Sequence, residues 1–415
     1  MIPAGIFPLE QYTREVDPIH ARGIIFEYSE ADSEKFSCTT KKMALISLEI
    51  PSVRVEGTME RLKKAVAQTA DVSEKNIWIC TTHNLTTMHI PPRDMKDKHE
   101  EFMKALENAV ISVCKKAIRE MKNVRIGVGF TTCDVNTNRD IKTNQGWWNG
   151  LQGEGEEDKL LTVYRIEDEA GIPVAVLYHY PIKSCTVTGS FYPDHTRVST
   201  SEITGESSRL IEEKTKAVAI FLMGAAADMV PAKCAVYSIA DANGDLKDID
   251  LGIKKGLEYK NELGAILGNE VCTCLEKIIC KEDVFLYWTR KQFWYRGQQF
   301  YNGGRPYHPT PDYKYVPAED EELVVDVLCI GDTVIFGLAP ETTAVIGRKL
   351  RERTNPVIAL VAAMVNGGKD YMADELSYER CTFSGTHSVF SRGTAEQFIE
   401  DAAKLVRKIY TEKRE

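Results

Sequence analysis

Short apolar runs that open into polar turns dominate the pattern of hydrophobic and polar positions along this 415-residue chain. Runs of about four to eight apolar residues between polar segments predict buried strands. The clearest runs are 76–80, 174–178, 217–223, 334–338 and 356–365. Three of them lead directly to side chains that can bind metals or transfer protons, namely His83, His179 and Glu341. Ligands of α/β proteins collect where strands end and loops begin, so these three residues mark the first candidate site.

Apolar residues at helical spacing lie between the strand-like runs and predict helices. The predicted helices are 59–70, 98–121, 206–215, 257–279, 342–352 and 394–412. Segments 23–28, 42–50, 59–70 and 76–80 predict a strand-strand-helix-strand start, and 160–178 and 322–338 predict hairpins. No linker divides the chain, so we expect one α/β domain over residues 1–415, with a mixed β-sheet core flanked by helices.

Two segments interrupt this alternation of strands and helices. Residues 133–155 predict a polar loop that carries Trp147-Trp148, a pair that is costly to expose without a purpose. Residues 287–315 are the most aromatic part of the chain and include Gly303-Gly304 and three prolines. Both segments could supply walls of a pocket, and 287–315 could equally be a packed surface flap.

Composition narrows the class of protein. Hydrophobic residues make up 43% of the chain, which permits a sizeable core, and the net charge of −9 argues against a nucleic-acid partner. The N-terminus has no signal-peptide pattern and no apolar run is long enough for a membrane anchor. Eleven cysteines, several within apolar runs, indicate reduced core thiols. We therefore expect a cytoplasmic protein with a small-molecule partner, and a homo-oligomer remains open.

Two histidines and a carboxylate at strand ends could hold zinc and leave a position for water. Each residue also has an ordinary structural interpretation. His83 and His179 could be hydrogen-bonded strand-end residues, and Glu341 could stabilise the N-terminus of the helix that follows it. The three residues lie far apart in sequence, so their spacing alone supports a zinc hydrolase only weakly.

Eight motifs in order resemble the catalytic domain of the neutral/alkaline (non-lysosomal) ceramidase superfamily. They are Asp17–Arg22, Thr81-Thr82-His83, Asn138-Arg139, His179, Ser201–Gly205, Phe221–Pro231, Pro340–Thr343 with Gly347–Arg351, and Asn366–Tyr371 with Tyr378-Glu379. The resemblance runs from about residue 15 to residue 405. It implies a ceramidase-catalytic-domain-like α/β fold and a zinc-dependent amidohydrolase.

The resemblance places zinc on four residues: His83, His179, Glu341 and Tyr371. It implies that zinc activates water and polarises the scissile carbonyl, with Tyr371 or Arg139 holding the oxyanion. Arg139 is also a candidate clamp for a substrate carboxylate, although a solvated arginine is the alternative. Further candidates are His89, either a catalytic replacement for the polar group lost from the metal loop or a surface residue, and Trp147, Trp148 and Asp228 as substrate-binding residues.

Several departures from the family pattern argue against ceramide as the substrate. Leu85 replaces the second histidine of the metal loop, Ala227 a glycine and Val230 a serine. No C-terminal β-sandwich domain is expected within the chain. The sequence thus predicts a zinc-dependent amidase for a smaller amide. The alternatives are a zinc hydrolase of an ester, lactone or cyclic imide, and a non-catalytic ligand-binding homologue.

Overall fold

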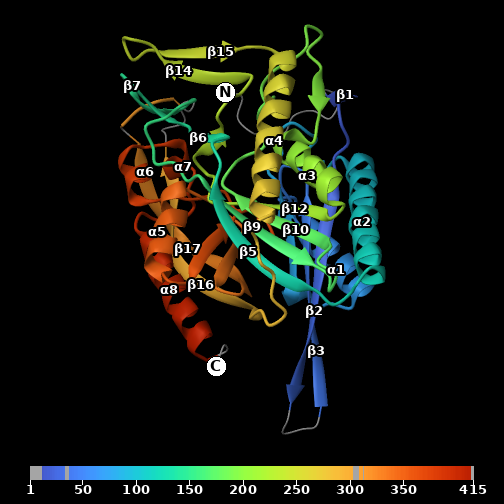
Figure 1. Ribbon diagram of the computed structural model, residues 1–415. Helices are drawn as coiled ribbons and strands as arrows, with labels where there is room; N and C mark the ends of the chain where they lie inside the picture. The colour runs from blue at the N-terminus through green and yellow to red at the C-terminus, as the bar shows by residue number, and fades with distance from the viewer. Residues whose placement is uncertain (1–11, 33–36, 302–307, 312, 413–415) are drawn as a thin grey trace.

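Three larger sheets form the body of the protein (Figure 1). The computed structural model describes residues 12–32, 37–301, 308–311 and 313–412. The first sheet has the order β2-β3-β4, with strands Ala21–Asp32, Ser37–Leu48 and Ile77–Thr81. The second has the order β12-β10-β9-β5, with strands Val218–Met223, Pro173–Tyr180, Leu160–Glu167 and Arg125–Thr132. The third has the order β16-β17-β18-β20, with strands Leu286–Tyr301, Lys314–Ile330, Thr333–Leu338 and Ile358–Ala362.

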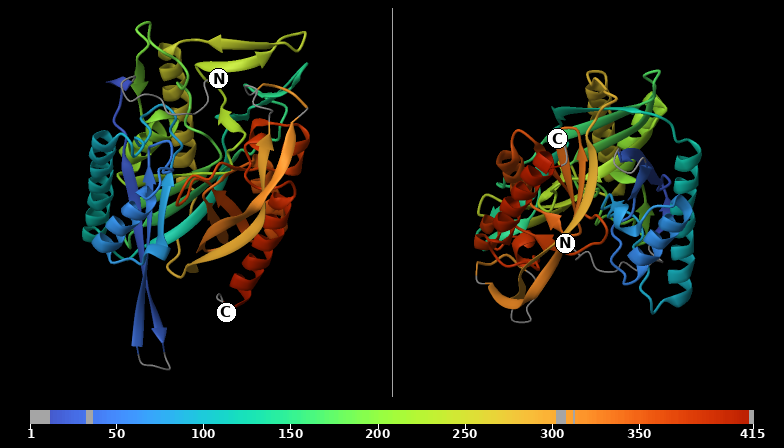
Figure 2. Two further views of the ribbon diagram at one scale, coloured as in Figure 1. Left: turned by 180° about the vertical axis from the view of Figure 1, so that it is seen from behind. Right: turned by 90° about the horizontal axis from the view of Figure 1, so that it is seen from below.

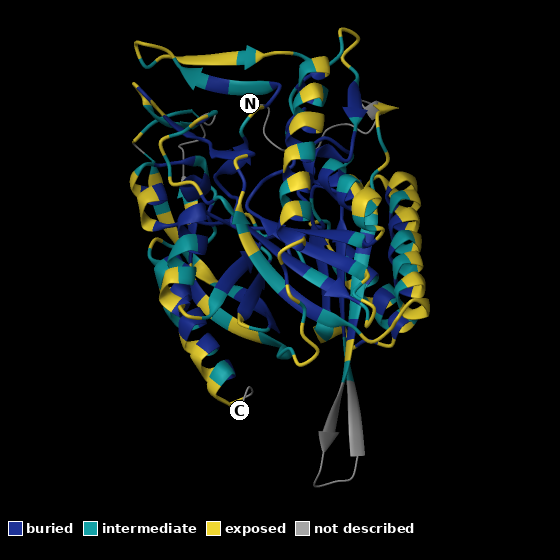
Figure 3. Cartoon of the chain, in the orientation of Figure 1, coloured by how far each residue is buried: buried dark blue, intermediate teal, exposed yellow. Residues whose placement is uncertain are grey.

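Helix pairs accompany each sheet and bury one face against it (Figures 2 and 3). The first sheet packs with α1 (Thr58–Ala70) and α2 (Lys96–Arg119), and the second with α3 (Glu202–Thr215) and α4 (Ile253–Leu275). The third packs with α5 (Ala344–Thr354) and α8 (Thr394–Glu412). The short helices α6 (Glu375–Glu379) and α7 (Phe383–Thr386) lie between β21 and α8 in the chain. None of the helices in the described ranges is long and apolar enough to span a membrane.

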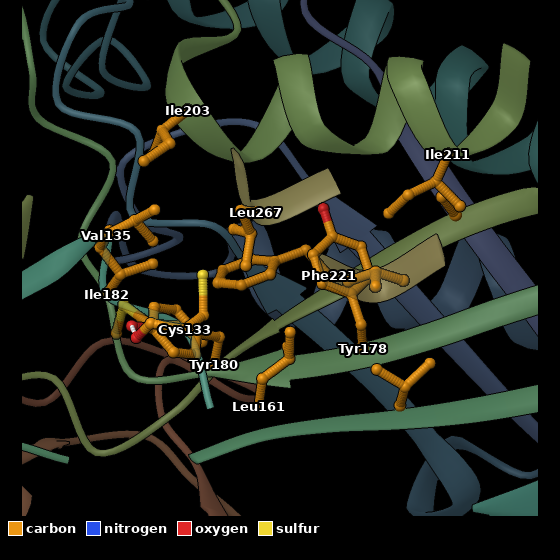
Figure 4. Close-up of a cluster of buried hydrophobic side chains, with 14 of the residues drawn as sticks. Cys133, Val135, Leu161, Tyr178, Tyr180, Ile182, Ile203, Ile211, Phe221 and Leu267 are labelled. Carbon is orange, nitrogen blue, oxygen red and sulfur yellow. Dashed lines mark hydrogen bonds between the residues drawn. The ribbon is translucent and has the colours of Figure 1, made fainter. Parts of the chain in front are cut away.

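The alternation of side chains along β10 divides the core. Val176, Tyr178 and Tyr180 belong to the cluster that includes α3 and α4 residues, whereas Ala175 and Leu177 belong to the cluster shared by all three sheets. Figure 4 shows the first cluster, where the Tyr180 hydroxyl donates a hydrogen bond to the Cys133 carbonyl. Because successive residues of a strand face opposite sides, the residue between the two tyrosines faces the sheet-to-sheet interior.

The ends of several parallel strands meet at one place. β4, β12 and β20 run parallel to β3, β10 and β18, respectively. Backbone hydrogen bonds then join the segments that follow: Thr81 N–H to Met364 O at 3.3 Å, Ala363 N–H to Met223 O at 2.9 Å, and Gly224 N–H to Tyr180 O at 3.0 Å. The polar turns predicted at the ends of these strands therefore come together, as the carboxyl edge of an α/β sheet predicts.

Most predicted elements agree with the structure, with two corrections. The segment 133–155 is not a plain loop, because it forms β6 (Asn136–Asn138), β7 (Asp140–Thr143) and β8 (Gly146–Asn149). Helix α3 begins at Glu202 rather than at residue 206. The 287–315 excursion is mainly the long β16–β17 hairpin, and its residues 302–307 and 312 lie outside the described part of the chain.

Smaller two-stranded pairs complete the fold. β6 pairs with β13 (Met229–Pro231), and β7 pairs with β8. β14 (Val236–Ala240) and β15 (Leu246–Asp250) form a hairpin, and β1 (Tyr12–Glu15) pairs with β11 (Arg197–Ser199). The pair that matters most for the site is β19 (Glu341–Thr342) with β21 (Tyr371–Met372), in which Glu341 lies directly beside Tyr371.

Candidate active site

A buried polar cluster lies where the strand ends meet. It consists of His83, Lys183, Glu341, Tyr371 and Arg139, and each of these residues is at most 9% exposed. His83 lies two residues after β4, and Lys183 lies three residues after β10. The parallel β19–β21 pair presents Glu341 and Tyr371 side by side. The cluster thus draws on segments that lie far apart in the sequence.

His83 is held in one orientation by the backbone around it. Its φ of 52° lies in the left-handed region, which non-glycine residues adopt at a cost and which is typical of functional turns. Its Nδ1 lies 3.0 Å from the Pro51 carbonyl oxygen, which can only accept, so Nδ1 carries the proton. Burial lowers the pKa of His83 to about 4, so the ring is neutral at pH 7 and Nε2 carries a lone pair.

Glu341 is the centre of the cluster. Its Oε1 lies 3.3 Å from Nε2 of His83, and its Oε2 lies 2.7 Å from Nζ of Lys183. Burial alone would raise the pKa of Glu341, but the neighbouring His83 and Lys183 lower it to about 2. Because His83 is neutral at pH 7, Lys183 is the cation that keeps this buried carboxylate ionised.

Tyr371 and Arg139 cover the other side of Lys183. The Lys183 ammonium donates to the Tyr371 hydroxyl at 3.4 Å, and the Arg139 guanidinium lies 6.0 Å from the centre of the Tyr371 ring. The Arg139 guanidinium lies 5.0 Å from the centre of the Phe383 ring. Because the Lys183 ammonium donates to the Tyr371 oxygen, the hydroxyl hydrogen of Tyr371 can be given to a further acceptor.

The donor edge of Arg139 is unsatisfied. Its Nε and Nη2 atoms are buried and have no hydrogen-bond partner within the described ranges. These two nitrogens form one of the flat bidentate edges with which a guanidinium binds a carboxylate. A buried, unpaired edge of this kind is costly, so it indicates a place for an anionic ligand group.

Asp228 and Asp140 form a pair of buried acidic residues outside the cluster. Oδ1 of Asp228 accepts from the Ala344 N–H of helix α5 at 2.8 Å, and Oδ2 accepts from Nδ2 of Asn138 at 3.1 Å. Burial and the nearby Asp140 raise the pKa of Asp228 to about 8. Asp228 therefore caps helix α5, which is the structural role that the sequence offered for Glu341. The Glu341 carboxylate instead pairs with Lys183 in the cluster.

The raised pKa of Asp228 predicts a particular pH dependence of stability. The folded protein keeps a proton that the unfolded chain releases above the ordinary aspartate pKa of 3.8, so the free energy of unfolding should fall as pH rises from about 4 to 8. The slope attributable to one such group is at most about 1.4 kcal/mol per pH unit. Asp228→Asn removes this group and should flatten the fall, measured by denaturant unfolding at several pH values.

The exposed Asp320 supplies a control for that experiment. Asp320→Asn should follow the wild-type pH dependence, because its carboxyl is exposed in both states. An unchanged slope in Asp228→Asn would show that Asp228 is ionised in the folded protein across this range.

Comparison with known proteins identifies the fold. No protein-family model matches the sequence, and no curated protein matches it. Among solved structures, one described as "Ceramidase complexed with C2" superposes with a TM-score of 0.66 at 12% identity, over 96% of this chain and 72% of that chain. The neutral ceramidase from Pseudomonas aeruginosa gives a TM-score of 0.64 at 11% identity, over 94% of this chain and 75% of that one. The chain has a ceramidase-like fold.

The ceramidase-like fold confirms the resemblance found in the motifs, while the implied ligand set needs a correction at His179. His179 lies between Tyr178 and Tyr180 and so faces the interior between sheets. Its Nε2 lies 2.7 Å from the Val361 carbonyl oxygen of β20, and a Cβ added at Gly224 would lie 2.9 Å from its ring. His179 therefore joins two sheets. Lys183 occupies the position near Glu341 that the sequence predicted for His179.

The residues present do not fit the implied zinc site. Within the described ranges, no three His, Cys, Asp or Glu side chains gather where they could hold a metal ion. His83, Glu341 and Tyr371 do converge, but the Lys183 ammonium lies against both of the latter two. A divalent ion about 4 Å from that ammonium would be repelled by roughly 8 kcal/mol at an effective dielectric constant near 20. Zinc therefore enters no step of the chemistry proposed for this site.

The remaining predicted site residues are not members of the cluster. His89 has Arg54 and Arg197 as its charged neighbours, and burial lowers its pKa. Trp147 lies on β8 beneath the Arg380 guanidinium, 4.1 Å from the ring centre, and Trp148 follows it on the same strand. Their roles in catalysis and substrate binding stay predictions. Val230 pairs with Thr137 in the β13–β6 ladder, where a valine suits a buried strand.

Lys183, a member of the cluster, and His387, which lies next to Tyr371, are the residues here that the sequence did not reveal. His387 stacks on Phe383 with ring centres 3.8 Å apart and lies 6.3 Å from the Tyr371 ring. One signal could have identified Lys183, because it follows the strand that ends in His179-Tyr180-Pro181 and is the first charged residue of that loop. No comparable signal marks His387.

Proposed function

We propose that this protein hydrolyses an amide bond in a small compound that carries a carboxylate, and that the reaction takes place at the His83–Lys183–Glu341–Tyr371–Arg139 cluster. The ceramidase-like fold supports the reaction class, since the solved structures that it resembles are ceramidases. The observation that carries the proposal is the convergence of a neutral imidazole, a paired carboxylate and three donors in one buried cluster. Convergence of titratable groups of this kind is typical of catalytic sites.

His83 and Glu341 are arranged to activate water. Nε2 of His83 and Oε1 of Glu341 are both acceptors, and they lie 3.3 Å apart. A water molecule can share one hydrogen between the two acceptors in a three-centre hydrogen bond, which turns an oxygen lone pair towards the substrate. In the proposed step this oxygen attacks the amide carbon while His83 Nε2 takes the proton as general base.

Tyr371 and Lys183 are placed to receive the charge that develops on the carbonyl oxygen. In the proposed step the Tyr371 hydroxyl and the Lys183 ammonium both donate to this oxygen, and the ion pair with Glu341 holds Lys183 in position. His83 then returns its proton to the amide nitrogen as the carbon–nitrogen bond breaks. The products are a carboxylic acid and an amine, so one water molecule is consumed and no redox partner is needed.

Arg139 supports an anionic substrate. Its unpaired Nε and Nη2 edge fits a carboxylate in bidentate geometry. Ceramide has no carboxylate, so this edge agrees with the departures at Leu85 and Val230. A small amide such as an N-acyl amino acid has the required combination of groups.

Matched substrates test the proposal. Amine release should be measured for N-acyl amino acids and for the same acyl amides without a carboxylate. Arg139→Met should lower kcat/KM about 100-fold for the carboxylate series and about tenfold or less for the neutral series. Arg139→Lys keeps the charge without the bidentate edge and should recover only part of the loss.

Two results would contradict the proposal. An equal loss of kcat/KM for both series would show that Arg139 does not bind a substrate carboxylate. No amine release from any amide by the wild type would show that the protein is not an amide hydrolase. Release of alcohol from matched esters at a higher kcat/KM than amine release would instead favour an ester as the scissile group.

A further inference from the structure

We infer that the ammonium of Lys183 takes the place of a divalent metal ion in this site, so that the protein binds its substrate and works without zinc. The inference concerns what occupies the site, and its catalytic half rests on the hydrolase proposed above. It follows from three features of the structure: the position of Lys183, the way its loop is fixed, and the number of ligands left for a metal.

The position of Lys183 is the one that a cation between these donors would need. Its Nζ lies 2.7 Å from Oε2 of Glu341 and 3.4 Å from the Tyr371 hydroxyl oxygen. The ammonium also lies 5.2 Å from the centre of the Tyr371 ring, whose face attracts a cation. The side chain is almost completely buried, and a buried ammonium is tolerated where a carboxylate balances it.

The loop that carries Lys183 is fixed to the loop that carries His83. Asn84 and Ser184 form a parallel bridge, and the Leu85 N–H donates to the Ser184 carbonyl at 2.9 Å. The Ser184 hydroxyl also lies 2.8 Å from the Thr204 hydroxyl of helix α3. Because the neighbouring residue is tied on both sides, the backbone of Lys183 is held beside the loop that carries His83.

The ligands left for a metal are too few. His83 and Glu341 are the nitrogen and carboxylate donors in the cluster, since His179 faces the region between sheets, where its Nε2 hydrogen-bonds the Val361 carbonyl. A catalytic zinc ion takes three protein ligands in addition to water, and Tyr371 already accepts from the Lys183 ammonium. A fixed positive charge can stabilise the oxyanion as a preorganised donor, which is the electrostatic part of the role of a metal.

Zinc binding by the wild type and by two variants tests this inference. Lys183→His replaces the cation with a third side chain that can bind a metal, and Lys183→Met is the neutral control of similar length. Each protein is incubated with zinc, passed through gel filtration, and measured for metal content and for Tm with and without a chelator.

The wild type should retain well under one zinc ion per chain, and its Tm should not change with zinc or chelator. Lys183→His should retain about one zinc ion per chain and show a higher Tm with zinc, and Lys183→Met should show weaker binding than Lys183→His. The inference is overturned if the wild type retains about one zinc ion per chain and His83→Ala removes it. The wild-type result decides the question even if a variant fails to fold.

These outcomes separate the inference from the proposed function. A wild type that binds no zinc and cleaves no amide would support the inference about the site and contradict the proposed hydrolase. A wild type that cleaves amides only when zinc is restored after chelation would keep the hydrolase and overturn the inference.

Discussion

Glu341→Gln is expected to abolish amide hydrolysis and to lower the free energy of unfolding by about 3–5 kcal/mol. The variant keeps the volume of the side chain but removes the charge that balances Lys183, whose Nζ lies 2.7 Å away in a buried cluster. It also replaces one of the two acceptors that would hold the attacking water. Amine release should fall at least about 1,000-fold, and denaturant unfolding measures the loss of stability.

A double variant separates the two effects. Lys183→Met together with Glu341→Gln removes both charges, so its stability should return to within about 1–2 kcal/mol of the wild type while hydrolysis stays absent. A Glu341→Gln protein that is as stable as the wild type would show that Lys183 is not balanced by this carboxylate. Full activity in the double variant would place the chemistry elsewhere.

Glu202→Ala should have the second-largest effect, because Glu202 joins the two loops that carry His83 and Lys183. Its fully buried carboxylate accepts from the Thr86 hydroxyl at 2.6 Å, the Thr186 N–H at 3.0 Å and the Val187 N–H at 3.0 Å. Removing it leaves these donors without an acceptor, which should cost about 3–5 kcal/mol of stability. Thermal and denaturant unfolding measure this loss.

The same helix provides a control. Glu213 is exposed and pairs with Arg209 on the surface, so Glu213→Ala should change the free energy of unfolding by less than about 0.5 kcal/mol. Activity in Glu202→Ala should fall further than the folded fraction does, because His83 and Lys183 lose their common anchor. A Glu202→Ala protein with wild-type stability would contradict the anchoring role.

Much of the fold was predictable from the sequence because its signals are local. Apolar runs at period two or at helical spacing located β10, β12, α2 and α8, and the hairpin predicted over 322–338 corresponds to β17–β18. The segment 133–155 was harder, because strands of three or four polar residues such as β6 and β7 carry little periodicity. The early start of helix α3 was missed because Glu202 adopts a φ of 60° and is buried.

The sequence predicted only those site residues whose type and motif indicate a catalytic or metal-binding role. His83, Glu341, Tyr371 and Arg139 were identified from motifs, and the structure brings these four together. His179 shared the motif signal, yet the strict alternation along β10 turns it towards the neighbouring sheet. Lys183 was not identified because a lysine in a loop is usually solvated, and its burial depends on Glu341, which lies 158 residues further along the chain.

Hydrolysis by the wild type in the presence of a chelator tests the account most directly. Protein stripped of divalent metal is mixed with an N-acyl amino acid, and amine release is followed with chelator and then with added zinc. The account predicts release at the same rate in both conditions. Release that stops with chelator and returns with zinc, or no release in either condition, would contradict it.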